Sequence, residues 1–149
     1  MGTNETIHDM ALLGRKIRTG FVAFVGEKIE GGPSPVEGRM LAFIIDHPSC
    51  NSADIREAFR LTKSTVSESL TSLANLGLIR LERSPDDARQ KTIVVTEKGF
   101  AHKAKIDEIC EVYDEAISKG ITEEEAEIIK KVTEKIHKNI EEVVGNGNE

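Results

Sequence analysis

Two short helix patterns joined by a tight turn, and followed at once by a strand pair, limit most strongly how this chain can fold. Thr62 can cap the second of these helices, and Gly77 is placed to end it. The stretches Leu78–Glu82 and Thr92–Val95 alternate apolar and polar residues on either side of the turn-forming segment RSPDDARQK. Residues 53–95 therefore predict a helix-turn-helix with a β-hairpin wing.

Helix patterns flank this centre on both sides. Apolar residues at three- and four-residue steps predict a first helix over about residues 5–29, and Ser34 with Glu37 forms a capping box for a second that stops before Pro48. Asn51 or Ser52 can cap the third helix. Thr96 is expected to cap a fifth helix that ends at Lys119–Gly120, and Thr122 with Glu125 opens the last. The fold class is mainly α with a small antiparallel β-hairpin.

Charge is distributed unevenly along the chain. The net charge of the 149 residues is −6, but residues 51–105 hold more basic than acidic side chains. Salt screens charges beyond about 8–10 Å, so only the charge near a contact decides whether a polyanion binds. The basic central part is thus compatible with a nucleic-acid partner.

The second helix of the helix-turn-helix is expected to lie in the DNA major groove with its first residues near base edges. Lys63 can meet a phosphate or a guanine, and Glu68 could accept a hydrogen bond from a cytosine amine. A plain helical hairpin, in which Ser and Thr serve only as caps, is the alternative. The predicted contact residues are Thr62, Lys63, Ser64, Thr65, Ser67, Glu68 and Thr71.

The stretch LTKSTVSESLTSLANLGLIRLERSPDDARQKTIVVTEKG, residues 61–99, resembles the signature of the MarR (multiple-antibiotic-resistance regulator) family. The shared features are a Lys-Ser-Thr-Val-Ser helix start, a Leu-Gly-Leu-Ile exit, a wing with Pro-x-Asp-x-Arg, and a strand that ends in Thr-x-x-Gly. The resemblance implies a double-stranded DNA-binding transcriptional regulator, commonly a repressor, that acts as a homodimer on a pseudo-palindromic operator.

The resemblance also assigns roles in the wing. It implies that Arg89 enters a minor groove and that Asp87 orients it, whereas an ordinary exposed loop salt bridge is the alternative. Family members often carry basic residues where this chain has Glu68, Leu81, Glu82 and Ala88. The recognition surface is thus less basic than is usual in the family. The predicted wing contacts are Arg83, Asp87, Arg89, Gln90 and Lys91.

Three regions follow from the family layout: an N-terminal dimerisation helix over 1–33, the winged helix-turn-helix over 34–99, and C-terminal dimerisation helices over 100–149. Apolar stripes on the first and last helices fit a dimer interface, although they could instead pack on their own chain. The interface residues expected are Ile7, Met10, Ile17, Phe21, Ile129, Ile136 and Ile140.

Relatives in the family often release DNA when a small aromatic or phenolic acid binds between the dimer helices and the winged domain. In this chain that crevice is expected near His8, Ile17, Arg39, Phe43 and Tyr113, which could equally be packing residues. No metal or cofactor is expected, because His47-x-x-Cys50 supplies only two ligands and the other histidines are scattered.

Other classes of protein are less well supported by the sequence. No nucleophile–base motif or Gly-rich phosphate loop indicates an enzyme, and no apolar run reaches the roughly 18 residues of a membrane span. Two cysteines and no secretory signal favour the cytoplasm. The alternatives are a winged-helix module that binds protein and, more weakly, a thiol sensor using Cys50 or Cys110.

Overall fold

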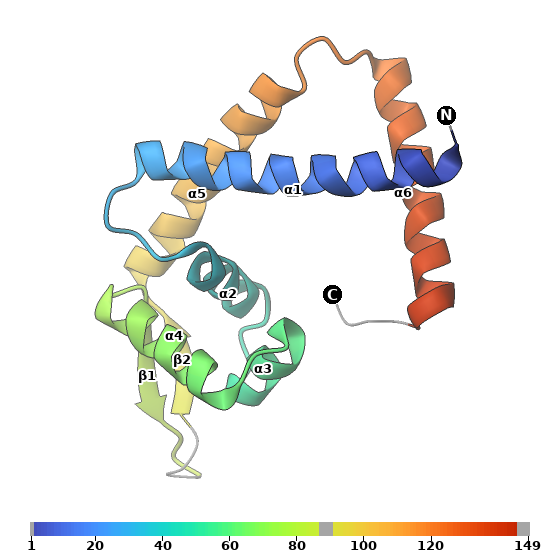
Figure 1. Ribbon diagram of the computed structural model, residues 1–149. Helices are drawn as coiled ribbons and strands as arrows, with labels where there is room; N and C mark the ends of the chain where they lie inside the picture. The colour runs from blue at the N-terminus through green and yellow to red at the C-terminus, as the bar shows by residue number, and fades with distance from the viewer. Residues whose placement is uncertain (1, 87–90, 146–149) are drawn as a thin grey trace. The chain divides into compact units, whose positions relative to one another are not determined.

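The computed structural model describes residues 2–86 and 91–145, so the predicted wing contacts Asp87, Arg89 and Gln90 lie outside the described residues. The chain forms two compact units, the first extending to Tyr113 and the second beginning at Asp114. The elements are α1 (Thr3–Lys28), α2 (Pro35–Asp46), α3 (Ser52–Phe59), α4 (Lys63–Asn75), β1 (Ile79–Arg83), β2 (Lys91–Val95), α5 (Glu97–Ile117) and α6 (Glu123–Val144) (Figure 1).

The helices begin where the capping residues predict. The Ser34 hydroxyl accepts from the Glu37 backbone N–H at 3.2 Å, and the Glu37 carboxylate accepts in return from the Ser34 N–H at 3.1 Å. At α3 the cap is Asn51, whose side chain accepts from the Asp54 N–H at 2.9 Å. Asn51, rather than Ser52, is therefore the residue that starts α3.

The end of α4 explains why the wing starts one residue later than the predicted Leu78. Gly77 has φ 76°, the left-handed conformation that glycine adopts without strain. The Leu78 N–H then bonds to the Leu73 carbonyl at 3.0 Å and the Gly77 N–H to the Ala74 carbonyl at 2.9 Å. These two bonds form a Schellman motif, which occupies Leu78 and leaves Ile79 to open β1.

The two strands pair antiparallel, with Ile79 opposite Val95 and Leu81 opposite Ile93. Ile79 and Ile93 are buried and face the helices, as the alternation predicts. Arg83 and Lys91, predicted on or beside the hairpin tip, form the last pair of the ladder. The strands thus extend farther towards the tip than the sequence indicated.

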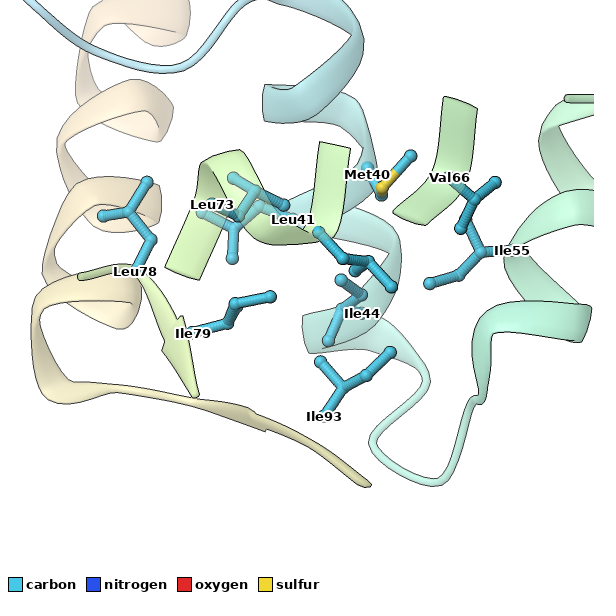
Figure 2. Packing of buried hydrophobic residues seen from close by; sticks show 10 residues of the cluster. Met40, Leu41, Ile44, Ile55, Val66, Leu73, Leu78, Ile79 and Ile93 are labelled. Atoms are coloured by element: carbon cyan, nitrogen blue, oxygen red, sulfur yellow. The ribbon is translucent and has the colours of Figure 1, made fainter. Parts of the chain in front are cut away.

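One hydrophobic cluster holds the winged helix-turn-helix together (Figure 2). Side chains from α2, α3, α4 and both strands meet in it, and each fully buried Leu or Ile contributes about 1.5–3 kcal/mol. Figure 1 shows α4 lying between α3 and the hairpin. The buried members are Met40, Leu41, Ile44, Ile55, Val66, Leu70, Leu73, Leu78, Ile79 and Ile93.

Within the first unit α1 packs on α5 through aromatic side chains. The Tyr113 ring lies 5.5 Å from the rings of both Phe21 and Phe24, measured between centroids. Its hydroxyl donates to the Ile17 carbonyl at 2.9 Å. A Cβ at Gly20 would overlap the Tyr113 hydroxyl, so a larger residue there would displace the Tyr113 side chain.

The second unit consists mainly of α6, which buries no residue of its own. Thr122 and Glu125 form the predicted capping box at its start. No helix in the part of the chain that the structure describes is both long enough and apolar enough to cross a membrane. Large apolar side chains exposed on α6 are Ile128, Ile129, Val132, Ile140, Val143 and Val144.

Candidate nucleic-acid interface

The burial of α4 on one side leaves its opposite face free. Val66, Leu70 and Leu73 point into the core, so the residues between them face outwards. Ser67, Glu68, Thr71 and their neighbours line a shallow hollow along this face. The exposed residues are Lys63, Ser64, Thr65, Ser67, Glu68, Thr71 and Asn75, which include every predicted contact residue of α4.

The first-turn hydroxyls of α4 already have hydrogen-bonding partners. Thr62 caps the helix by accepting from the Thr65 N–H at 3.2 Å, and its hydroxyl lies 2.8 Å from that of Thr65 and 3.2 Å from that of Ser64. Across the described ranges, the hydroxyls of Ser67 and Thr71 make no such bond. The hydroxyls of α4 that have no hydrogen-bonding partner in the described ranges thus begin in its second turn.

The wing places two cations opposite each other. Arg83 and Lys91 are a directly opposed cross-strand pair, and both are exposed. Like charges in this position destabilise a strand pair, so an anion such as phosphate would be attracted to them. Glu82 does not neutralise them: it alternates to the other face and pairs with Arg80 at 3.5 Å.

The base of the wing is bonded to both neighbouring helices. The Thr96 hydroxyl donates to the Gly77 carbonyl at 2.6 Å and accepts from the Gly99 N–H at 3.0 Å. The Lys98 ammonium donates to the Leu76 carbonyl at 2.7 Å. These bonds tie the end of α4 and the start of α5 to the hairpin.

Close packing adds to this connection. A Cβ on the buried Gly99 would overlap the Leu78 carbonyl oxygen, which leaves room only for glycine. Sequence reasoning predicted Thr96 as a helix cap but did not include Thr96, Lys98 or Gly99 among the site residues. Their Thr-x-x-Gly spacing was the available signal, although it does not by itself reveal the contact with Gly77.

A cavity of about 550 Å³ lies in the first unit between the end of α1, the loop that follows, α2 and α5. Of the five residues predicted for a ligand crevice, Arg39 lines this cavity. Phe43 instead stacks on His47, with ring centroids 4.2 Å apart, and contacts Phe59 edge-on. Tyr113 packs on α1 and bonds to the Ile17 carbonyl, and His8 is exposed on α1.

The lining of the cavity combines apolar walls with cationic groups. Arg18, Arg39, His102 and Lys103 contribute positive or proton-donating side chains. The single carboxylate in the lining, Asp107, pairs with Lys103. Burial, and secondly the charge of Lys98, lower the pKa of His102. Apolar lining comes from Phe21, Val22, Val25, Ile29, Leu41 and Ile106.

The cysteines and histidines do not gather into a metal site in the described ranges. No group of three or more His, Cys, Asp or Glu side chains with suitable geometry occurs there. Cys50 is partly buried against the core. Burial and the nearby Asp54 charge raise the pKa of its thiol, which reduces the reactive thiolate at neutral pH.

A helix-turn-helix whose second helix is exposed, followed by a two-stranded wing, defines a winged-helix DNA-binding protein. A sequence model of the MarR family matches residues 32–90. The transcriptional regulator HosA of Escherichia coli O111:H- is 30% identical over 93 residues, which cover 62% of this chain and 69% of HosA. The chain belongs to the MarR family of transcriptional regulators, which are not enzymes.

Solved structures agree with this fold. MepR, a transcription regulator of the Staphylococcus aureus multidrug efflux pump MepA, is 18% identical, with a TM-score of 0.76 over 94% of this chain and 99% of its own. BpsR of Bordetella bronchiseptica, whose DNA binding is regulated by 6-hydroxynicotinic acid, is 20% identical, with a TM-score of 0.62 over 85% and 91%. At these identities the likeness shows the fold alone.

Proposed function

We propose that the protein is a homodimeric repressor that binds a pseudo-palindromic operator through α4 and the wing, and that a small aromatic acid releases it. The opposed Arg83–Lys91 pair, together with the exposed outer face of α4, is the observation that carries the DNA-binding part. It concentrates positive charge on a chain that is acidic overall. The protein would act on the chromosome, in the cytoplasm.

The first test is binding to genomic fragments, including the region upstream of the protein's own gene, at two salt concentrations. Removing one phosphate contact should reduce the slope of log affinity against log salt by about 0.9. Arg83→Ala and Lys91→Ala should each reduce this slope, and the Arg89→Ala variant tests the minor-groove role that the family resemblance implies. Lys119→Ala, the same change at an exposed residue that belongs to neither α4 nor the wing, should leave binding unchanged.

A protein-docking module would behave differently in this experiment. It would bind no DNA fragment selectively by sequence, and it would still bind a partner protein after Arg89→Ala. Selective binding that is insensitive to salt and to all three wing substitutions would contradict the assigned contacts while leaving a regulator in place.

The dimer is supported by apolar surface that the single chain leaves uncovered. Ile7 and Ile17 on α1 are 47% and 39% exposed, and Ile129 and Ile140 on α6 are each 52% exposed. Met10, Phe21 and Ile136 are partly buried. Exposed apolar surface of this kind favours a protein–protein interface. Light scattering should give twice the chain mass for the wild type, and Ile129→Glu with Ile140→Glu should shift it towards one chain.

The ligand part is supported by the cavity beside α2 and α5. Its volume falls in the range of about 300–1,000 Å³ that suits small molecules. Arg18 and Arg39 take part in no ion pair within the described ranges, so an anion can meet them above apolar walls. We place the ligand here, with Arg39 retained from the predicted crevice.

The cavity is also connected to the DNA-binding helix. α2 lines the cavity and contacts α4. α5 also lines the cavity, and its Lys98, together with Thr96 just before the helix, bonds to the residues that follow α4. A ligand that moves either helix would therefore displace α4. Hydroxybenzoic acids and 6-hydroxynicotinic acid should raise the melting temperature and weaken operator binding. Arg39→Met should abolish both effects, and an unchanged response would contradict this location.

A further inference from the structure

Glu68 is the one acidic side chain on α4, and it stands in the middle of the exposed face. Its neighbours one turn away on either side are Ser64, Thr65, Thr71 and Ser72, all short and uncharged. The Glu68 side chain is longer than each of them. Any ligand that lies along this face of α4 must therefore meet the Glu68 carboxylate.

No cation of the protein compensates this carboxylate in the ranges that the structure describes. The ion pairs there join Arg80 to Glu82 and Lys103 to Asp107. None of the positions three or four residues away from Glu68 is basic, so the usual helix pairing is missing. Lys63, the only basic residue of α4, lies five residues earlier, roughly 140° around the helix.

A carboxylate without a compensating cation is unfavourable beside DNA, unless the edge of a base donates a hydrogen bond to it. In the major groove guanine presents two acceptors and thymine presents an acceptor and a methyl group. Adenine offers its amino group next to the N7 acceptor. Cytosine presents its N4 amino group and no acceptor of its own on this edge, so it is the base that an uncompensated carboxylate fits best.

We propose that Glu68 is a specificity-determining residue that accepts a hydrogen bond from the N4 amino group of a cytosine in each operator half-site. This inference rests on the proposed function, in which α4 occupies the major groove. The same charge repels the phosphates of every sequence that lacks this cytosine. Glu68 thus lowers non-specific affinity and raises selectivity together.

The test is a selection from random double-stranded DNA with the wild type, Glu68→Gln and Glu68→Ala. The wild type should yield a two-fold motif with cytosine at one fixed position in each half-site, and replacing that cytosine should weaken binding about 5- to 150-fold. Glu68→Gln should change the preference at that position to adenine, which a glutamine amide meets with two hydrogen bonds. Glu68→Ala should lose the preference there and bind random DNA more tightly.

Glu27→Gln is the matched control, because it removes the same charge from an exposed position on α1. It should select the wild-type motif. If Glu68→Gln and Glu68→Ala also select the wild-type motif, the role proposed for Glu68 is wrong, but the proposed function as a DNA-binding regulator is not contradicted. If the wild type selects no motif, the proposed function itself fails, and the role of Glu68 with it.

Glu68 makes no hydrogen bond or ion pair in the described ranges, so folding of the Glu68 variants, checked by circular dichroism, should be unchanged.

Discussion

The winged region and α6 both carry periodic apolar patterns, but the winged region buries its apolar residues and α6 leaves its own exposed. Leu73, Ile55 and Met40 have no exposed surface, whereas Ile129 on α6 remains 52% exposed. In the winged region three helices and a hairpin converge on one cluster. The comparison shows that helical periodicity identifies the face to be buried, but not whether the covering surface belongs to the same chain.

The largest expected effect separates the two regions directly. Leu73→Ala should lower the free energy of unfolding by about 2–5 kcal/mol, since it leaves a cavity among side chains that cannot fully collapse. Ile129→Ala, measured at a concentration at which the protein is monomeric, should change the free energy of unfolding by less than about 0.5 kcal/mol. Urea unfolding followed by circular dichroism measures both. Equal losses would mean that α6 is packed within its own chain.

Gly99→Ala tests the closest backbone approach in the winged region. The new Cβ would meet the Leu78 carbonyl, so we expect a loss of about 1–3 kcal/mol. Gly14→Ala on α1 is the control, because no atom lies within 4 Å of its added Cβ. Alanine should there stabilise the helix by about 0.5–1 kcal/mol. A neutral Gly99→Ala would show that the base of the wing can move.

A smaller effect is expected at the turn between α3 and α4. Arg60 has φ 52°, the left-handed conformation that costs a side-chain-bearing residue about 1 kcal/mol. Arg60→Gly removes this strain but adds freedom to the unfolded chain, so the gain should not exceed about 1 kcal/mol. Arg60→Ala keeps the strain and should give no gain. Thermal unfolding of the three proteins distinguishes these outcomes.

The smallest effect is a pH dependence that belongs to the first unit. The pKa of His102 is lowered in the folded protein, whereas histidine in the unfolded chain has its ordinary pKa of 6.5. Below that pH the unfolded chain therefore binds more protons than the folded protein does. The stability contributed by neutral His102 is present above pH 6.5 and is lost as pH falls below it. Urea unfolding between pH 7 and pH 5 should therefore show a decline that is weaker in His102→Gln. An identical decline in both proteins would assign it to other groups.

Local chemistry explains why much of the fold was predictable. Ser34, Thr62 and Thr122 start helices through bonds to residues three positions away, and Gly77 ends α4 through bonds of similar range. Contacts between residues so close in the sequence can be predicted from a short stretch of it. The same holds for the exposed face of α4, which is fixed by its own apolar spacing.

Contacts between distant segments were not predictable in this way. Arg39 and Phe43 lie one turn apart on α2, yet Arg39 lines the cavity while Phe43 stacks on His47 and contacts Phe59 edge-on. Their different surroundings come from α5 and α3, which helix spacing within α2 does not specify. The bond from Thr96 to Gly77 joins residues 19 positions apart for the same reason.

That bond has a consequence for how the wing can change in evolution. The bond between Thr96 and Gly77 closes the hairpin at its base, so the residues between them form one closed loop of the chain. Loop length enters the closure entropy only logarithmically, and adding a residue pair to both strands keeps each side chain on its face. The reach of the wing can therefore lengthen or shorten in steps without moving α4 or α5. Under the proposed function, the span of DNA that the wing covers would then vary independently of the bases that α4 contacts.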